Sequence, residues 1–410
     1  MTIDCDVLVV GAGPAGSSAA RAAALNGSNV ILIEKREKPG KTECGEAIGS
    51  YLIPYIPINL PKDQLLWKTN GMSFDTDDIH IERYGKLWEA YSIDRGKLDY
   101  WLSQHPLKKG AKLFTNTNLI DLDYDKNIVK KAIVKQGKKK IEIYPKILIA
   151  ADGAESTVSK LLGLFKPKKD DIAEIYSFEY KNVNNINPNL EQIYLGNYIN
   201  GGYGYVFPKS KKRINIGVGS IFKQNLKKSF EEFCELPQIK KQIKNSTIVK
   251  EKSGKAPVIS FINKRHLGNV LLSGDAACQN FKPYAEGILP GIICGDICGK
   301  TASLFLKNKV GLEAYEEKVE KKLGILFKES DKITSMLYNL FLMKDKKKFL
   351  ILTALASNLF SFEEIEKMKK YEYSKIKNLI EKESKNTFSK EINERLQLSV
   401  LGLKRILSKW

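Results

Sequence analysis

The chain has 410 residues, enough for two or three domains, and 43% of them are hydrophobic, a share typical of a globular protein with a substantial core. Lysine and arginine total 67 against 47 acidic residues, which gives a formal net charge of +20. Such a surface attracts nucleic acid, phospholipid headgroups or an acidic electron carrier, although a Lys- and Glu-rich solvated surface without a partner has the same composition.

Short patterns exclude several classes of protein. The chain begins without the basic segment of a secretory signal, so we predict no such signal. It has no uncharged apolar run of 18 residues, so we predict no transmembrane helix. The pattern of a nucleic-acid-binding module is missing, so we expect no specific nucleic-acid partner. Cys294 and Cys298 have the spacing of a shared helix face, but no second pair completes a metal site. We therefore expect reduced thiols and no metal.

The first predicted unit contains a strand, a glycine-rich turn, a helix and a second strand. Residues 6–10 are valine-rich, as in a strand buried on both faces, residues 17–25 predict a helix, and residues 30–33 predict the second strand. The glycines of the turn follow GxGxxG order at Gly11, Gly13 and Gly16. In dinucleotide-binding folds these glycines permit a tight turn, close approach of a pyrophosphate and close helix packing. Glu34 ends the second strand, where an acidic residue binds ribose hydroxyls, so the sequence predicts a bound FAD or NAD.

Later segments favour FAD over NAD. Arg95 opens a predicted helix and offers a second contact to phosphate or ribityl oxygens. Two further buried strands run into an Asp beside a Gly, at Asp152-Gly153 and at Gly274-Asp275. An aspartate at the end of a strand can bind a ribityl hydroxyl, and the N-terminus of the helix after Gly287 can direct N–H groups at a flavin carbonyl.

Taken together, these motifs resemble the FAD-dependent group that includes para-hydroxybenzoate hydroxylase. The resemblance implies an α/β fold, α+β overall, in which a Rossmann-type FAD-binding domain carries an inserted antiparallel β-sheet substrate domain and a C-terminal helical region. The predicted bounds are 1–70, 91–165 and 265–310 for the FAD-binding domain, 71–90 and 166–264 for the substrate domain, and 311–410 for the helical region. Within this group, a nicotinamide donor docks transiently without a second Rossmann domain.

Two further stretches resemble the geranylgeranyl reductases, which hydrogenate isoprenoid chains. "KTECGEAI" places Cys44-Gly45 after the second strand, and "GGYGYVFPKS" lies where the substrate domain is expected. Tyr205 stands where the family motif has tryptophan, so an aromatic wall is kept with another shape. In "QNFKPYAEGI", Phe281 and Lys282 separate Asn280 from Pro283, which are adjacent in the family.

These motifs and the resemblance give a set of candidate site residues. For FAD they are Gly11, Gly13, Ala15, Gly16, Glu34, Lys35, Cys44, Gly45, Arg95, Ala151, Asp152, Gly153, Gly274, Asp275, Gly287 and Ile288. For a prenyl substrate they are Tyr203, Tyr205, Phe207 and Pro208, and the candidate catalytic residues are Cys44, Tyr205 and Glu286. The cysteine lies near the flavin in the resembling enzymes, but a small buried hydrophobe would explain it as well. The proton donor stays open, with Glu286 and Tyr284 in a suitable segment.

The C-terminal part changes character. After residue 311, Gly and Pro become sparse, and residues 336–360 predict two short buried helices joined by a basic turn at 344–348. These helices form either the mouth through which a lipid enters, with lysines facing anionic headgroups, or a bundle packed on the sheet. The chain ends in a predicted basic amphipathic helix.

The resemblance implies an FAD-dependent reductase that saturates the C=C bonds of a geranylgeranylated lipid, acting peripherally at the cytoplasmic face of an anionic membrane. Its electron donor would be NAD(P)H or a ferredoxin-type carrier. One alternative has the same fold: a flavin-dependent monooxygenase or halogenase. Another, from a different class, is an electron-transfer flavoprotein that reduces quinone. A nucleic-acid-binding protein without flavin is the remaining alternative.

Overall fold

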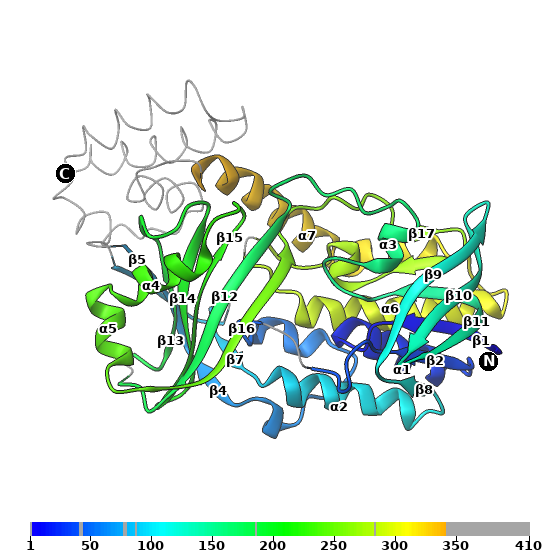
Figure 1. Cartoon of the computed structure of the whole chain (residues 1–410), viewed down its shortest axis with the longest axis horizontal. Coiled ribbons are helices and arrows are strands. Elements are labelled where there is room, and N and C mark those ends of the chain that lie inside the picture. Colours follow the sequence, from blue (N-terminus) through cyan, green and yellow to red (C-terminus); the bar gives the residue numbers. More distant parts are fainter. Residues whose placement is uncertain are drawn as a thin grey trace.

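Two large β-sheets lie side by side along the long axis of the molecule (Figure 1). They are seen in a computed structural model that describes residues 2–40, 44–76, 80–86, 88–184, 187–282 and 284–341. The first sheet is mainly parallel and contains the N-terminal strand, and the second is mainly antiparallel. A three-stranded sheet completes the β-structure of these residues, with strands in the order β3 (Ala47–Gly49), β7 (Ala90–Ser92) and β4 (Trp67–Thr69).

The parallel sheet carries the core of the first unit. Its strand order is β17 (His266–Leu267), β18 (Val270–Leu272), β11 (Lys139–Ala150), β1 (Thr2–Val10), β2 (Val30–Ile33) and β8 (Lys112–Phe114), and β9 (Thr117–Asp125) and β10 (Ile128–Gln136) extend it from β11. Strand β1 pairs in parallel with both β2 and β11. Its residues 7–10 are at most 5% exposed, because both faces of the sheet are covered.

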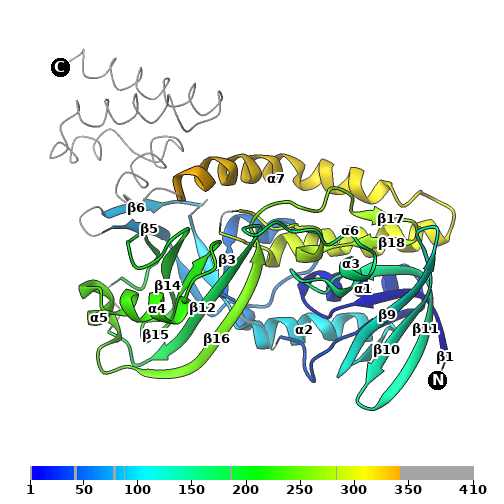
Figure 2. The ribbon, with the colours of Figure 1, turned by 45° about the horizontal axis from the view of Figure 1, so that its top comes forward.

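Helices α1 (Pro14–Leu25), α6 (Ile288–Leu306) and α7 (Ala314–Phe341) pack on one another beside this sheet (Figure 2). Small residues let α1 and α6 approach closely: a side chain at Gly295 would begin 2.1 Å from the carbonyl oxygen of Ala15, and one at Gly299 would begin 2.0 Å from that of Ala19. Of the described helices, α6 alone has the length and hydropathy to span a bilayer, and 72% of its most apolar window is buried.

The antiparallel sheet has strand order β16 (Thr247–Pro257), β12 (Ile172–Lys181), β15 (Arg213–Ser220), β14 (Gly202–Ser210), β13 (Leu190–Tyr194), β5 (Gly71–Asp75) and β6 (His80–Tyr84). All neighbours are antiparallel except β13 and β5. Helices α4 (Leu226–Cys234) and α5 (Pro237–Ile243) cover one face with Phe230, Phe233 and Ile239. The opposite face lines the cavity described below.

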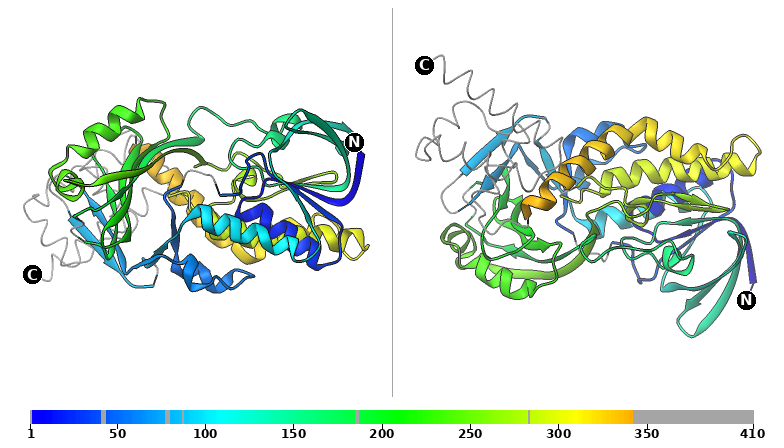
Figure 3. Two further views of the ribbon diagram at one scale, coloured as in Figure 1. Left: turned by 60° about the horizontal axis from the view of Figure 1, so that its bottom comes forward. Right: turned by 90° about the horizontal axis from the view of Figure 1, so that it is seen from above.

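The remaining short elements connect these layers. They are α2 (Arg95–Leu107), α3 (Thr157–Leu161), and the 3₁₀ helices η1 (Ser50–Tyr55), η2 (Lys62–Gln64) and η3 (Gly274–Ala277). Helix α2 lies beside α1, under the parallel sheet in the left view of Figure 3. Helix α2 begins at Arg95, as predicted, because Asp94 caps it by accepting a hydrogen bond from the backbone N–H of Lys97.

The predicted fold class is confirmed: a parallel sheet with helices and a separate antiparallel sheet are joined in one chain. The residue bounds of the three domains stay a prediction. The prediction of two short helices over 336–360 is wrong at its start, because α7 runs without a break from Ala314 through Met336 to Phe341. Residues 342–410, with the predicted basic turn and amphipathic tail, lie outside the described residues.

Candidate functional site

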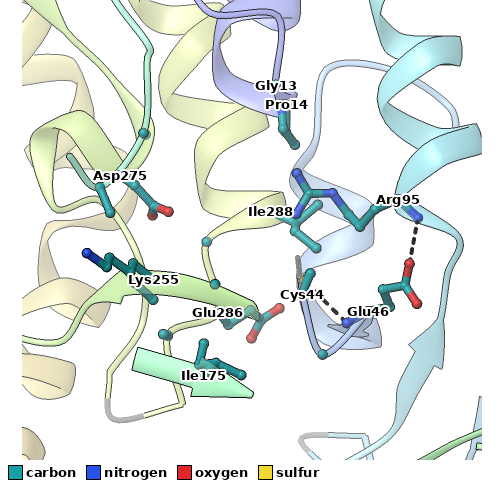
Figure 4. Close-up of a pocket in the computed structure, with 18 of the residues that line it drawn as sticks. Gly13, Pro14, Cys44, Glu46, Arg95, Ile175, Lys255, Asp275, Glu286 and Ile288 are labelled. Carbon is teal, nitrogen blue, oxygen red and sulfur yellow. Dashed lines mark hydrogen bonds between the residues drawn. The ribbon is translucent and has the colours of Figure 1, made fainter. Parts of the chain in front are cut away.

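A cavity of about 1110 Å³ lies between the carboxyl ends of the parallel strands and one face of the antiparallel sheet. Segments far apart in the chain line it, from the turn after β1 to the start of α6 (Figure 4). Its volume exceeds the roughly 300–1,000 Å³ that is usual for a small-molecule site, so it has room for more than one ligand.

The three glycines of the first turn have different surroundings. Gly11 has a φ of +99°, and a Cβ there would lie 2.4 Å from the carbonyl oxygen of Ala151. A Cβ at Gly16 would lie 1.8 Å from the carbonyl oxygen of Gly11, so this residue keeps the helix against the strand. At Gly13 a Cβ would meet nothing within 4 Å, because the residue faces the open cavity. Gly13 also precedes α1, whose N-terminus no side chain caps.

Glu34 lies in the cavity wall at the end of β2, where it is 6% exposed. Its Oε2 accepts a hydrogen bond from the backbone N–H of Ala12 at 3.0 Å, and its Oε1 accepts one from that of Arg36, also at 3.0 Å. These bonds fix the carboxylate beside the glycine turn, and its remaining lone pairs can accept hydrogen bonds from ribose hydroxyls.

Asp275 and Arg95 point toward each other across the space below Gly13 (Figure 4). Burial raises the pKa of Asp275 to about 6, against the opposing charges of Arg95 and Lys282. The Arg95 guanidinium donates to both oxygens of Asp99, at 2.8 and 2.7 Å, and this ion pair outweighs burial and raises the pKa of Arg95. Arg95 thus lines the cavity while its guanidinium is paired with Asp99.

Asp152 follows β11, and its carboxyl group is directed partly away from solvent. Its Oδ2 accepts a hydrogen bond from the backbone N–H of Val158 at 3.1 Å, whereas its buried Oδ1 has no partner among the described residues. Burial raises the pKa of Asp152, and the hydrogen bonds around the start of α3 act against that effect. Asp152 and Gly153 both line the cavity.

The segment around Cys44 lies against the antiparallel sheet. The amide group of Asn215 donates to the carbonyl oxygens of Cys44 and Gly45, at 2.9 and 2.8 Å. The thiol of Cys44 accepts a hydrogen bond from the backbone N–H of Glu46 at 3.2 Å, and Arg95 lies beside it. A side chain at Gly45 would begin 3.0 Å from the ring of Phe207. The loop therefore contacts the antiparallel sheet through Asn215 and Phe207, and α2 through Arg95.

An ionic cluster, formed by Glu46, Glu179, Lys209, Lys252 and Arg213, anchors this loop, and all of its members except the half-exposed Arg213 are buried. The Oε2 of Glu46 accepts hydrogen bonds from Lys209, at 2.7 Å, and from Lys252, while its Oε1 accepts one from the backbone N–H of Arg95. Glu179 binds Lys209 at 3.0 Å and also Arg213. Burial alone would raise the pKa of Glu46, but the charges of Lys252 and Lys209 hold it below its usual value. Sequence reasoning missed this cluster.

The predicted aromatic wall is only partly exposed to the cavity. Because side chains alternate along β14, the cavity side of this strand carries residues 203, 205, 207 and 209. Of these four, Phe207 alone lines the cavity. Tyr205 is 4% exposed, with its ring 4.5 Å from that of Phe207 and in the space left by Gly217. Tyr203 packs at 5.8 Å on Tyr284, which does line the cavity.

Pro208 lies on the other face of β14. It pairs with Ile214, which belongs to the cluster beneath α4 and α5. Because side chains alternate along a strand, Pro208 and the cavity-facing Phe207 point in opposite directions. The structure therefore places the predicted substrate residues Tyr205 and Pro208 away from the cavity surface.

Two carboxyl groups, Glu286 and Glu191, line the cavity on the side of the antiparallel sheet, here called the substrate end, and they differ in their hydrogen-bond partners. Glu286, at the turn before α6, accepts hydrogen bonds from the backbone N–H of Gly49 at 2.9 Å and from the hydroxyl of Tyr51 at 3.0 Å. Burial raises the pKa of Glu286, while these two bonds act in the opposite direction. Glu191, on β13, is 1% exposed and lines the cavity, and its Oε1 has no partner among the described residues. Glu191 stands in none of the sequence motifs described above.

The cavity brings most of the candidate residues together. Those that line it are Gly11, Gly13, Ala15, Glu34, Lys35, Cys44, Gly45, Arg95, Ala151, Asp152, Gly153, Phe207, Gly274, Asp275, Glu286, Gly287 and Ile288. Gly16 supports the turn from behind. The family motif's Pro283 lies outside the described residues. The roles of all these residues stay predictions.

The residues present fit FAD. The N-termini of α1 and α6 carry no side-chain cap, and both open on the cavity, where their N–H groups can bind a pyrophosphate and a flavin carbonyl. Gly13 leaves free space where a phosphate would lie, and the carboxylates of Glu34 and Asp275 can accept hydrogen bonds from sugar and ribityl hydroxyls. Among the described residues, no group of three or more His, Cys, Asp and Glu side chains is arranged to hold a metal.

Comparison with known proteins agrees with this architecture. Residues 6–154 match the family of FAD-dependent oxidoreductases, and residues 171–255 match the geranylgeranyl reductase catalytic domain. The chain is 32% identical over 331 residues to the digeranylgeranylglycerophospholipid reductase of Methanocaldococcus jannaschii, covering 77% of this chain and 82% of that protein. It is 33% identical over 335 residues to the reductase of the same name from Methanosarcina acetivorans, covering 77% and 80%.

Solved structures share the fold. A geranylgeranyl bacteriochlorophyll reductase-like protein from Thermoplasma acidophilum superposes with a TM-score of 0.78 at 24% identity, covering 93% of this chain and all of that one. A flavin-dependent brominase superposes with a TM-score of 0.68 at 16% identity, covering 99% of this chain. At these identities, the likeness concerns the fold alone.

Proposed function

Because this chain belongs to the geranylgeranyl reductase family of FAD-dependent oxidoreductases, we propose that it saturates the isoprenoid C=C bonds of a geranylgeranylated glycerophospholipid. The relatives from Methanocaldococcus and Methanosarcina are named for that class of substrate. The family membership is the basis for expecting flavin chemistry. The shape of the cavity supports a lipid as the substrate.

One observation carries this proposal: the dinucleotide cradle and an apolar wall belong to the same cavity. The wall is formed by the antiparallel sheet and the loop before β7, through Met72, Trp88, Ile175, Ile193 and Phe207. A prenyl chain gains about 0.8 kcal/mol for each CH₂ group that such a wall removes from water. No charged group is needed to hold the chain, so apolar contact and shape would bind it.

When bound and reduced, FAD supplies a hydride equivalent to one carbon of a double bond. The glycine turn after β1, Glu34 and Asp275 would hold the dinucleotide, and the Cys44 loop would lie at the side facing the antiparallel sheet. Phe207 and its neighbours would keep the alkene against that side and exclude water. The ionic cluster would hold the loop in place while its own charges stay paired within the protein. The second carbon needs a proton, which the chain must provide.

The proposed site of action is the cytoplasmic face of the membrane, where the lipid resides. The formal charge of +20 supports this, because anionic lipid surfaces attract lysine-rich proteins by about 1 kcal/mol for each residue near the surface. The reducing partner is NAD(P)H or a ferredoxin-type carrier, which the experiment below distinguishes.

The test is to incubate the FAD-loaded protein anaerobically with dithionite and a geranylgeranylated glycerophospholipid, and then to measure the lipid by mass spectrometry. We expect a gain of two hydrogens for each bond reduced. Parallel reactions with NAD(P)H or reduced ferredoxin replacing dithionite identify the donor. If geranylgeranyl phospholipid, geranylgeranyl diphosphate and menaquinone all remain unchanged, the proposed function is wrong. Oxygen-dependent oxidation of NAD(P)H with a hydroxylated product would indicate a monooxygenase instead.

A further inference from the structure

A second carboxyl group faces the substrate end of the cavity from the middle of the antiparallel sheet. Glu191 lies on β13, where Met72 of β5 is its register partner, and Gln192 pairs with Val206, which places Glu191 beside Phe207. Its two cross-strand neighbours, Met72 and Phe207, are therefore apolar. The ring of Phe207 in turn lies 3.0 Å from the position that a Cβ on Gly45 would take. Phe207 therefore lies between Glu191 and the Cys44 loop.

The two buried carboxyl groups at this end are suited to different tasks. Glu286 already accepts a hydrogen bond on each oxygen, from Gly49 and from Tyr51, and protonation of the carboxyl would weaken these bonds. Glu191 is only 1% exposed, and its buried Oε1 has no hydrogen-bond partner among the described residues. A carboxyl group left in this state costs least free energy when it is neutral and carries a proton.

We propose that Glu191 is the proton donor of the alkene reduction. The inference rests on the proposed function. The O–H bond of the Glu191 carboxyl breaks, and its proton forms a C–H bond with the π electron pair of the alkene at one carbon. The other carbon receives a hydride, whose two electrons come from the reduced donor through FAD. Glu191 is left as a carboxylate and regains a proton from water that enters the cavity after the product leaves.

The surroundings of Glu191 keep the proton in place at neutral pH. Burial, and then the negative charge of Glu286, raise the pKa of Glu191 to about 8. Other titratable groups also line the cavity. They include Tyr51 in η1, Glu89 before β7 and Tyr284 before α6, and further Cys44 and Glu46 of the Cys44 loop, Arg95 in α2, Glu174 and Tyr176 on β12, and Lys255 on β16. Glu89 is paired with Lys68 at 3.0 Å. Activity that depends on the protonated form of Glu191 should fall as the pH rises above about 8.

The decisive experiment compares FAD-loaded wild type, Glu191→Gln and Glu191→Asp. Glutamine keeps the size of the side chain but cannot act as the acid. Flavin absorbance and the rate of flavin reduction by dithionite should be unchanged in Glu191→Gln, while lipid reduction should fall by about 10²- to 10⁴-fold. Glu191→Asp should restore part of the rate, with a shifted alkaline limb in its pH profile. Glu251→Gln, on an exposed part of β16, is the matched control and should react like wild type.

A second readout does not depend on turnover. At neutral pH, the infrared spectrum of the oxidised wild-type holoenzyme should contain the band of a protonated carboxylic acid that is absent from Glu191→Gln and present in Glu251→Gln. The difference spectrum of wild type minus each variant isolates this band. Lipid reduction by Glu191→Gln within about threefold of the wild-type rate would overturn the proposal, as would an unchanged acid band. If Glu191→Gln does not fold, the pH profiles decide: identical profiles for wild type and Glu191→Asp overturn it. If wild type itself reduces no lipid, the proposed function fails, while the acid band still reports on Glu191.

Discussion

The two walls of the cavity are built in different ways. At the ends of the parallel strands, backbone groups and missing side chains form the binding surface: Gly11 and Gly16 allow close approach of chain segments, and Gly13 leaves open space. On the antiparallel sheet, side chains form it, with Phe207 and Glu191 facing the cavity and the ionic cluster beneath the Cys44 loop. The first wall suits a cofactor of fixed shape, and the second suits a substrate that must be oriented and protonated.

The largest expected effect concerns the ionic cluster of the second wall. Lys252 is fully buried and donates to Glu46, so Lys252→Met leaves an incompletely paired carboxylate in the interior. Because Lys209 still binds Glu46, we expect the loss of this charge-assisted hydrogen bond to cost about 1.5–3 kcal/mol of unfolding free energy. Urea unfolding followed by circular dichroism measures it. Lys250→Met, exposed on the same strand, should cost less than about 1 kcal/mol; equal losses for both variants would contradict the assigned role.

The glycines of the first wall separate folding from cofactor binding. Gly16→Ala would place a Cβ 1.8 Å from the carbonyl oxygen of Gly11, and overpacking of this kind costs about 1–3 kcal/mol or more. Gly13→Ala has free space and should fold with wild-type stability, yet bind FAD at least about tenfold more weakly, or about 1.4 kcal/mol. Thermal unfolding of the apoprotein and flavin fluorescence titration measure the two effects. A Gly13→Ala variant with unchanged FAD affinity would show that no phosphate approaches there.

The contact between the two walls depends on Asn215. Asn215→Ala removes two hydrogen bonds to the carbonyl oxygens of Cys44 and Gly45, and we expect a loss of about 1–2 kcal/mol of unfolding free energy. FAD affinity should fall less than the rate of lipid reduction, because the Cys44 loop is only one part of the predicted FAD site and the glycine turn lies on the other wall. The rate of lipid reduction should fall, because the loop beside Phe207 is loosened. Unchanged stability and rate would mean that the loop is held without this side chain.

The smallest effect is a dependence on pH. The pKa of Glu46 is lowered in the folded protein, so its contribution to stability is complete above the ordinary value of about 4.5 and is lost as the pH falls through the lower folded value. The stability difference between wild type and Glu46→Gln should therefore shrink in acid, by at most about 1.4 kcal/mol per pH unit. Denaturant unfolding at a series of pH values measures it. A difference that stays constant into strong acid would contradict the lowered pKa.

The contrast between the walls also explains what sequence could and could not predict. Gly11, Gly13, Gly16 and Glu34 lie within one short unit whose spacing encodes its own geometry, so the cradle was predictable. Asp275 also occupies the expected strand end.

The second wall depends on strand register and on contacts between distant segments. Side chains alternate along β14, so Pro208 lies on the far face and Lys209 lies beside the cavity wall. The spacing of the motif already contains this alternation, but the predicted aromatic wall grouped Pro208 with Phe207. Glu191 and Lys252 stand in no motif. Only the pairing of β13 with β14 and of β16 with β12 brings them to the cavity and its ionic cluster, so neither could be predicted from local sequence.

The central claim is that one cavity holds both the flavin and the prenyl chain. Its most direct test is to reduce the FAD-loaded protein anaerobically with one equivalent of dithionite, and to follow flavin absorbance after mixing with lipid in a stopped-flow instrument. We predict that absorbance of oxidised flavin returns with a geranylgeranylated phospholipid and not with its fully saturated counterpart. Flavin that stays reduced with both lipids, or reoxidises equally fast with either, would contradict the claim.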